Sequence, residues 1–289
     1  MRCIFLIAFL GLAVAACDTA IDPFDRDGLQ FSIQGYLDAQ ADTQYVRVTP
    51  LRDSLALNLF ESPDYTVELH HEVDGRTVRM QDSLFRFVGG RFAYNWWASG
   101  ELEHGRGYRL TVQGADGATS SVRVQIPESI PEMELIIPRD PFTPLRFLTQ
   151  AIKIRKVEKL AALQLKYRVV FPPQVEAEPQ IVNMSILQRV GPIGPDLGIA
   201  FFPYKDLMAR FDGACPLVLS TEVILAASTD DWPDLEGIDP ETLARPDVIS
   251  NVENGVGFLG GLSITREDWG ELTQLAQGLQ FQCERGTYF

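Results

Sequence analysis

The sequence predicts a mainly β protein, and three features of the chain lead to this fold class. First, apolar and polar residues alternate with a period of two from Leu29 onward, as in half-buried strands. Second, Asp-Gly pairs interrupt two of the alternating runs, at residues 74–75 and 116–117, where such pairs are typical of hairpin turns. Third, the runs follow one another at intervals of about ten residues with turn signals between them, which favours antiparallel sheets.

Residues 1–16 are expected to be a secretory signal rather than a membrane span. Arg2 precedes an uninterrupted apolar run that ends at Ala16, and this run is shorter than the about 20 apolar residues that cross a bilayer. The run ends in Val-Ala-Ala-Cys, which resembles the lipobox of bacterial lipoproteins. That resemblance implies a lipid on Cys17, enough for stable anchoring; an ordinary cleaved signal with a chance cysteine is the alternative. Residues 17–28 are polar and are expected to form a tether.

Residues 29–127 are predicted to form an N-terminal immunoglobulin-like antiparallel β-sandwich. The stretches LQFSIQGYL and TQYVRVTPL alternate as strands do, and YTVELHHEVDGRTVRM places two strands around a type I′ turn. The stretch GYRLTVQGADGATSSVRVQIP repeats this design, and Pro127 ends it. Short strands at this spacing are typical of a sandwich.

Residues 128–289 are predicted to form a second β-rich domain with short helices. A proline-rich crossing opens it, and two strands are expected around residues 160–163. Helices are expected over residues 204–211, after Asp239 as N-cap, and from Thr265 as the start of a capping box. The apolar face of the last helix holds Trp269, Leu272, Leu275, Ala276 and Leu279.

The start of this second part also carries a basic cluster. In an acidic chain such a cluster could face lipid headgroups or an acidic partner. The alternative is that the lysines and arginines are the solvated faces of two edge strands, where lysine blocks edge pairing. The cluster comprises Arg146, Lys153, Arg155, Lys156, Lys159, Lys166 and Arg168.

Charge and cysteine content narrow the function classes. The 289 residues include 39 acidic and 25 basic side chains, for a net charge of −14, and this argues against nucleic acid as a partner. Beyond the signal and the anchor only Cys215 and Cys283 remain, an even pair in an oxidising compartment that favours a disulfide, with free buried thiols as the alternative. Two cysteines without a nearby histidine do not make a structural zinc site.

Glycines at positions 255, 257 and 260 match the Gly-x-Gly-x-x-Gly pattern of dinucleotide-binding loops. That function needs a buried strand before the motif, a helix that opens inside it and an acid about 20 residues later. The stretch SNVEN before the motif is polar, and too little chain follows for such a unit. The sequence instead predicts a hairpin turn at Asn254-Gly255 and a glycine-rich strand that another backbone or ring approaches closely. No cofactor is expected.

The chain shows no catalytic constellation, and we expect no enzyme activity. His70 and His71 are adjacent on an expected strand and point to opposite faces, and His104 lies in a loop, so none is expected to bind a metal. No Gly-x-Ser-x-Gly, HExxH or phosphate loop occurs. Asp230 and Asp231 form a carboxylate pair that could serve glycoside hydrolysis, but such a pair carries little information among 39 acids.

The aromatic run Phe92–Trp97 is the strongest binding signal. Tyr94 and Trp96 share one face of an expected strand and Trp97 takes the other, so at least one large ring is a candidate platform for a sugar or a protein partner. Burial of a tryptophan between the two sheets is the alternative.

Four stretches together resemble an uncharacterised family of outer-membrane lipoproteins, whose members are typically encoded near TonB-dependent receptors of the Sus type. They are the lipobox, FSIQGYLDAQADTQYVRVTPLRDS, GYRLTVQGADGATSSVRVQIP and PDVISNVENGVGFLGGLS. The resemblance implies an outer-membrane lipoprotein accessory to uptake, with no catalytic residues to carry over. We therefore expect a non-enzymatic, lipid-anchored envelope protein that binds a transporter or its ligand; a surface glycan-binding protein or glycoside hydrolase is the alternative.

Overall fold

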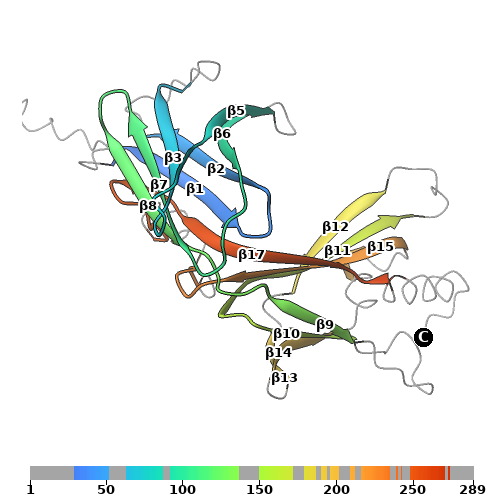
Figure 1. Ribbon diagram of the computed structural model, residues 1–289. Coiled ribbons are helices and arrows are strands. Elements are labelled where there is room, and N and C mark those ends of the chain that lie inside the picture. Colours follow the sequence, from blue (N-terminus) through green and yellow to red (C-terminus); the bar gives the residue numbers. More distant parts are fainter. Residues whose placement is uncertain are drawn as a thin grey trace, which may run out of the picture.

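The computed structural model describes residues 29–51, 63–86, 92–136, 150–171, 179–186, 190–193, 196–201, 209–211, 216–234, 239, 242, 248–270 and 273. These residues form a mainly β fold, as the sequence predicts, with three sheets. Figure 1 shows one long sheet that runs through both halves of the molecule, and a smaller sheet beside each half.

The order of strands in the long sheet joins the two ends of the chain. It runs β12 (Gln180–Ser185), β11 (Lys159–Val170), β15 (Leu217–Ser228), β17 (Leu259–Asp268), β1 (Phe31–Asp38), β2 (Thr43–Pro50), β6 (Phe92–Ser99) and β5 (Gln81–Arg86), with β16 (Gly255–Val256) also paired to β1. The second sheet runs β4 (Thr77–Arg79), β3 (Tyr65–His71), β7 (Gly107–Gly114) and β8 (Thr119–Gln125). The third runs β13 (Gly191–Ile193), β14 (Asp196–Phe201), β10 (Gln150–Arg155) and β9 (Glu132–Ile136).

Each smaller sheet packs on one half of the long sheet and encloses a hydrophobic core. In the first core, Trp96 of the long sheet packs on Tyr65 of the second sheet with ring centroids 5.2 Å apart. In the second core, Leu165 and Leu225 of the long sheet pack with Ile152 of the third sheet. A third, smaller cluster of described residues forms around Ala226, Leu262 and Ile264, and Trp232 packs against it. Alternation predicts these strands because every second side chain reaches a core.

Both predicted hairpins form, but their turns are not type I′. In the β3–β4 hairpin, the His71 N–H donates to the Arg76 carbonyl at 2.8 Å, and only Gly75 in the loop has a positive φ, of 71°. In the β7–β8 hairpin, Gly117 alone has a positive φ, of 87°. A type I′ turn needs a positive φ at both central residues. The loops here are longer, and in each of them only the glycine has a positive φ.

Strand β17 links the two halves of the molecule. Its first part pairs parallel with β1, where Gly260 lies opposite Tyr36, and its second part pairs antiparallel with β15, where Thr265 lies opposite Leu225. Residues 128–289 therefore supply a central strand to the sheet that begins within residues 29–127. The helix start predicted at Thr265 is wrong: Thr265 lies inside this strand, opposite Leu225 of β15, and this sheet pairing overrides the local cap signal.

Helical geometry is confined to isolated positions of the described residues. The Trp269 N–H still donates to Thr221 at 2.8 Å, and the Trp269 carbonyl then accepts the Thr273 N–H at 3.1 Å, so the first helical bond begins four residues after Thr265. Asp239 makes the expected cap, since its carboxylate accepts the Thr242 N–H at 2.8 Å. No complete helix lies within the described ranges, and none there is long and apolar enough to cross a membrane.

The glycine-rich segment forms a strand, and its expected close approaches are confirmed. A Cβ on Gly257 would overlap the Ile33 carbonyl oxygen, and one on Gly261 would overlap the Gln125 carbonyl oxygen. The hairpin at Asn254 is wrong: Asn254 has a turn-like φ of 52°, but both Gly255 and the strand after it pair parallel with β1. The motif is therefore packed backbone and not an open phosphate loop.

A buried carboxylate fixes the point where β17 leaves β1. Asp38, 5% exposed, accepts the Ile264 N–H at 3.2 Å and the Gln40 N–H at 3.0 Å through Oδ1. The Gln44 amide accepts the Asp38 N–H and donates to the Asp38 carbonyl, both at 2.9 Å. These bonds replace the sheet pairing that ends at this point.

We expect Asp38→Ala to lower the free energy of unfolding by about 2 kcal/mol or more, because two backbone N–H groups at a mainly buried junction lose their acceptor. Urea unfolding followed by circular dichroism measures this change. Asp42→Ala is the control, since Asp42 is exposed and its loss is expected to stay within about 0.5 kcal/mol. Equal midpoints for the two variants would contradict the role given to Asp38.

Candidate functional site: an aromatic face on the long sheet

Three of the predicted site residues lie outside the described residues. Cys17, the expected lipidation site, precedes residue 29, and Cys215 and Cys283, the expected disulfide, fall within ranges that the structure does not describe. The lipid anchor and the disulfide therefore stay predictions from the sequence.

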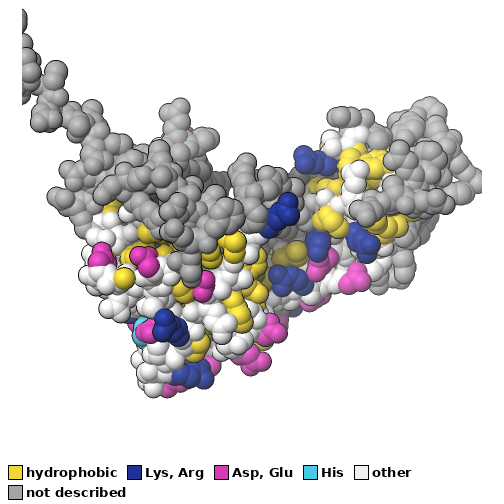
Figure 2. Space-filling model, turned by 90° about the horizontal axis from the view of Figure 1, so that it is seen from above, with side chains coloured by type: hydrophobic (Ala, Val, Ile, Leu, Met, Phe, Trp, Pro, Cys, Tyr) yellow, Lys and Arg dark blue, Asp and Glu magenta, His cyan; other side chains and the backbone are white. Residues whose placement is uncertain are grey.

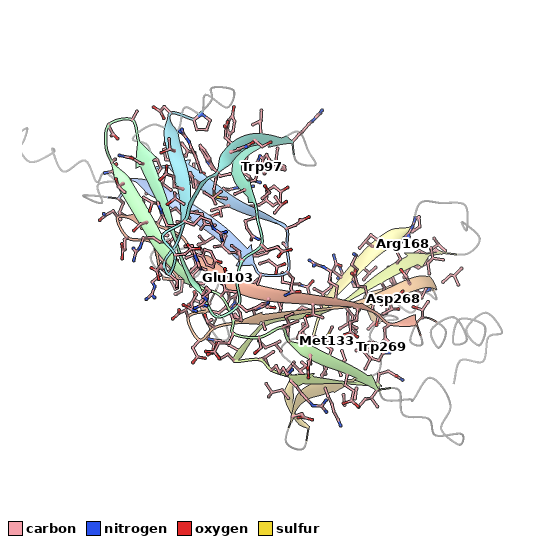
Figure 3. The ribbon with its side chains drawn as sticks, viewed as in Figure 1. Trp97, Glu103, Met133, Arg168, Asp268 and Trp269 are labelled. Atoms are coloured by element: carbon pink, nitrogen blue, oxygen red, sulfur yellow. The ribbon has the colours of Figure 1, made fainter. Side chains whose placement is uncertain are left out.

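The remaining three predicted residues, Tyr94, Trp96 and Trp97, lie on β6 and divide between its two faces. Trp96 is 5% exposed and belongs to the first core, which is the alternative that the sequence left open. Tyr94 is half-buried on the same face as Trp96. Trp97 is half-buried on the opposite face, and Figure 3 labels it on the first half of the molecule. Trp97 is therefore the residue of the run that can belong to a surface platform.

The pairing of β6 with β2 and of β2 with β1 aligns two further rings with Trp97, and the sequence alone did not predict this alignment. Tyr45 of β2 lies directly opposite Trp97, and Tyr36 of β1 lies directly opposite Tyr45. Tyr45 is 49% exposed and Tyr36 is 47% exposed. Both tyrosines occupy outward positions of alternating strands, a signal present in the sequence, but their alignment depends on pairing between strands. We call Tyr36, Tyr45 and Trp97 the aromatic row.

Further rings border both ends of the aromatic row. On the side of β5, the Phe85 ring meets the Tyr45 ring edge-on, with centroids 6.0 Å apart. On the side of β17, Gly260 lies opposite Tyr36, and the Trp232 ring occupies the space where a side chain of Gly260 would stand. Figure 2 shows hydrophobic side chains gathered on the side of the first half that is turned toward the second.

The polar groups around the aromatic row are almost all uncharged. The four strands β1, β2, β6 and β5 contain two acidic residues: Asp38, which is buried, and Asp82, which pairs with Trp96 and shares its face. On the outward face, the Arg47 guanidinium donates to the Asn95 side-chain oxygen at 3.3 Å. On these four strands, the described outward positions expose no carboxylate, which is distinctive in a chain of net charge −14.

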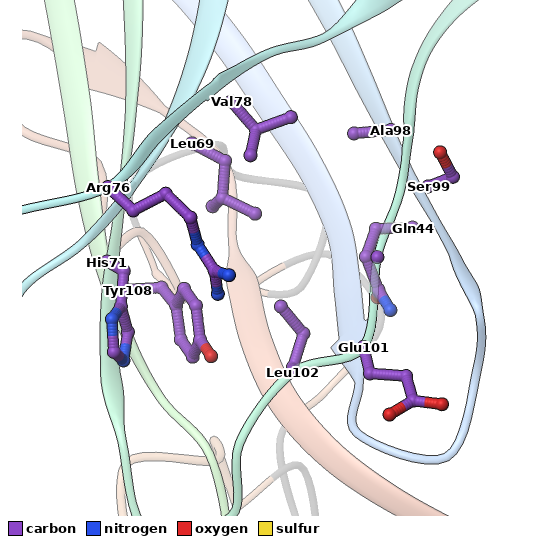
Figure 4. Close-up of a pocket in the computed structure, with 11 residues that line it drawn as sticks. Gln44, Leu69, His71, Arg76, Val78, Ala98, Ser99, Glu101, Leu102 and Tyr108 are labelled. Atoms are coloured by element: carbon purple, nitrogen blue, oxygen red, sulfur yellow. The ribbon is translucent and has the colours of Figure 1, made fainter. Parts of the chain in front are cut away.

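Strands β1, β2, β6 and β5 of the long sheet and the second sheet enclose the first core, and we call this part the first sandwich. It contains a small pocket of about 160 Å³. Figure 4 shows Arg76 reaching over the Tyr108 ring, with Leu102 and Gln44 on the other side. Burial raises the pKa of Tyr108. The Tyr108 hydroxyl accepts the Glu103 N–H at 2.9 Å.

The histidine next to this pocket has a structural role. His71 is 4% exposed, its ring lies 5.0 Å from that of Tyr108, and its Nδ1 is 2.5 Å from the Asp74 carboxylate. The Arg76 N–H and then His71 hold the pKa of Asp74 below its usual value. His70 contacts Thr77 instead, on the other face of β3. In the parts of the chain that the structure describes, no cluster of His, Cys, Asp or Glu could hold a metal.

Four residues of the basic cluster contact neighbouring acids or a carbonyl, and Arg146 lies outside the described residues. Arg155 contacts Glu134 at 2.9 Å and Asp196 at 3.3 Å, and these two acids raise its pKa. Lys166 contacts Glu222 at 2.7 Å. Lys159 donates to the Trp232 carbonyl at 2.6 Å, and Lys156 contacts Glu132 at 2.6 Å. These partners favour the solvated strand faces that the sequence left as the alternative.

Comparisons with known proteins assign no family. No family model matches the chain, and no curated protein matches it significantly in sequence. Among solved structures, it is similar to a pullulanase complexed with maltotriose from Anoxybacillus sp. LM18-11, with 12% identity over 69% of this chain and 24% of that chain and a TM-score of 0.23. It is also similar to the Dpr2 Ig1-Ig2 complex with DIP-Theta Ig1-Ig3, with 14% identity over 68% of this chain and 89% of that chain and a TM-score of 0.22. The chain spans about a quarter of the pullulanase, and TM-scores this low define no common fold.

Proposed function

We propose that the protein is a non-enzymatic binding protein of the cell envelope, anchored in the outer membrane by a lipid on Cys17. The first sandwich, which we propose to be immunoglobulin-like, presents the binding surface, and an outer-membrane transporter or its ligand is the partner. The observation that carries the proposal is the aromatic row, in which Tyr36 and Tyr45 are exposed and Trp97 is half-buried, together with the resemblance of residues 14–17 to a lipobox. Exposed rings that are not needed for a core are typical of binding surfaces.

The path of the chain supports a binding surface that lies away from the anchored end. The tether precedes Leu29, so the chain enters the fold at the start of β1, and Tyr36 lies five residues beyond Phe31 on that strand. At about 3.3 Å a residue, the aromatic row is about 17 Å from the entry point. Strand β17 runs parallel to β1 and continues into the second sandwich. The aromatic row therefore lies between the point of attachment and the second sandwich.

We expect Cys17→Ser to move the protein from the membrane pellet to the soluble fraction, because a lipid anchor and not net charge holds an acidic protein on a membrane. Cell fractionation with immunoblotting measures the distribution. Cys3→Ser is the matched control, since Cys3 lies within the expected signal and its loss leaves the anchor intact. Membrane retention of Cys17→Ser would contradict the anchor.

Cross-linking in intact cells, followed by affinity purification, tests the binding function. We expect an outer-membrane transporter or an envelope glycan to be recovered with the wild-type protein. Recovery of neither would count against a binding role, whatever the outcome for the anchor.

A further inference from the structure

We infer that the aromatic row binds an uncharged polysaccharide chain, laid across strands β17, β1, β2 and β6. This inference rests on the proposed binding function and names the chemical class of its ligand. Three observations carry it: the alignment of the rings, the kind of side chain that surrounds them, and the charge of the face.

The alignment gives an extended platform instead of a single ring. Tyr36, Tyr45 and Trp97 occupy directly paired positions on three neighbouring strands, and Trp232 covers Gly260 on the fourth. Neighbouring strands lie about 4.8 Å apart, so the four positions extend over about 14 Å. A platform of this length fits several units of a chain-like ligand better than one small molecule, which normally takes a concave pocket.

The side chains on this face suit sugar rings. A sugar presents C–H groups on the faces of its ring and hydroxyls around the edge, so it stacks on aromatic rings while amides bind its hydroxyls. The outward positions of β1, β2, β6 and β5 hold no valine, leucine or isoleucine, and on β17 Leu262 and Ile264, on the face of Gly260, are buried. Gln34, Asn95 and Gln81 stand among the rings as uncharged hydrogen-bonding groups.

The charge of the face selects an uncharged ligand. With 39 acidic residues in the chain, the field around the protein repels polyanions. Among the described residues, the outward positions of β1, β2, β6 and β5 expose no carboxylate, whereas the exposed Asp230 and Asp231 beside Trp232 add negative charge at the β17 end. The Arg47 guanidinium is engaged with Asn95. The negative charge therefore disfavours an anionic ligand, and ring stacking with neutral hydrogen bonds is left to bind an uncharged one.

Affinity electrophoresis of the full-length protein, purified in detergent, tests the inference. Gels contain dextran, laminarin, galactomannan or xyloglucan as neutral polysaccharides, and polygalacturonate as an anionic one. We expect at least one neutral polysaccharide to retard the wild-type protein and polygalacturonate to leave its mobility unchanged.

Variants then locate the site. Trp97→Ala and Tyr45→Ala are each expected to raise the dissociation constant by up to about tenfold, whereas Tyr45→Phe keeps the ring and most of the affinity. Ile181→Ala is the matched control, because Ile181 is 51% exposed on β12, in the other half of the molecule. The midpoint of thermal unfolding is measured for each variant, so that a loss of binding can be distinguished from a loss of folding.

Three results would overturn the inference. They are the absence of retardation by all four neutral polysaccharides, retardation by polygalacturonate alone, and wild-type affinity in folded Trp97→Ala and Tyr45→Ala. If these variants instead lose a cross-linked envelope protein, the aromatic row is a protein interface; the polysaccharide inference then fails while the proposed binding function stands. The proposed binding function is tested separately by the cross-linking experiment, and it fails if no partner is recovered from intact cells.

Discussion

A Gly257→Ala variant is expected to lose about 3 kcal/mol or more of folding free energy, and Gly261→Ala a similar amount. At Gly257 the new Cβ would overlap the Ile33 carbonyl oxygen, and the backbone there has a φ of 105°, which L-residues avoid. At Gly261 it would overlap the Gln125 carbonyl oxygen. Neither obstacle is a side chain that can rotate away, so β17 would have to shift relative to β1 or β8.

Urea unfolding and soluble expression measure these effects. Gly191→Ala and Gly270→Ala are the matched controls, because a Cβ at either position meets nothing within 4 Å and neither has a positive φ. We expect both controls to unfold at nearly the wild-type urea concentration. Wild-type stability of Gly257→Ala would show that β16 and β17 do not pack on β1 as described.

Trp96→Ala is expected to cost about 3–5 kcal/mol, as large-to-small substitutions of buried aromatic residues do. Its ring packs 5.2 Å from the Tyr65 ring between the two sheets of the first sandwich, and it is 5% exposed. Trp97→Ala, one residue away, removes a half-buried ring from the outward face and is expected to cost about 1 kcal/mol.

Urea unfolding monitored by far-ultraviolet circular dichroism compares the two variants without depending on tryptophan fluorescence. The adjacent positions control for local backbone propensity, because both substitutions replace tryptophan by alanine in the same strand. A larger loss for Trp97→Ala than for Trp96→Ala would mean that the faces of β6 are reversed.

Much of the strand content could be predicted from the sequence because it depends on local patterns. Alternation located β1, β2, β3 and β7, and glycine at positions 75 and 117 marked both hairpin loops, although the turn type was wrong. The close approaches at Gly257 and Gly261 were also predicted, since glycine within a strand has few other uses. The helix start at Thr265 was wrong because a capping pattern is local, whereas the pairing of β17 with β1 and β15 is not.

The amino-acid sequence was enough to predict an acidic, β-rich chain and the alternation that turns Trp96 and Trp97 to opposite faces; the secretory signal and the lipid anchor stay predictions. The folded structure shows that Trp96 is the buried one and aligns Trp97 with Tyr45 and Tyr36 across three strands. This difference arises because a strand's period of two follows from its own backbone. The neighbour and register of each strand instead depend on burial against distant parts of the chain, such as residues 255–268.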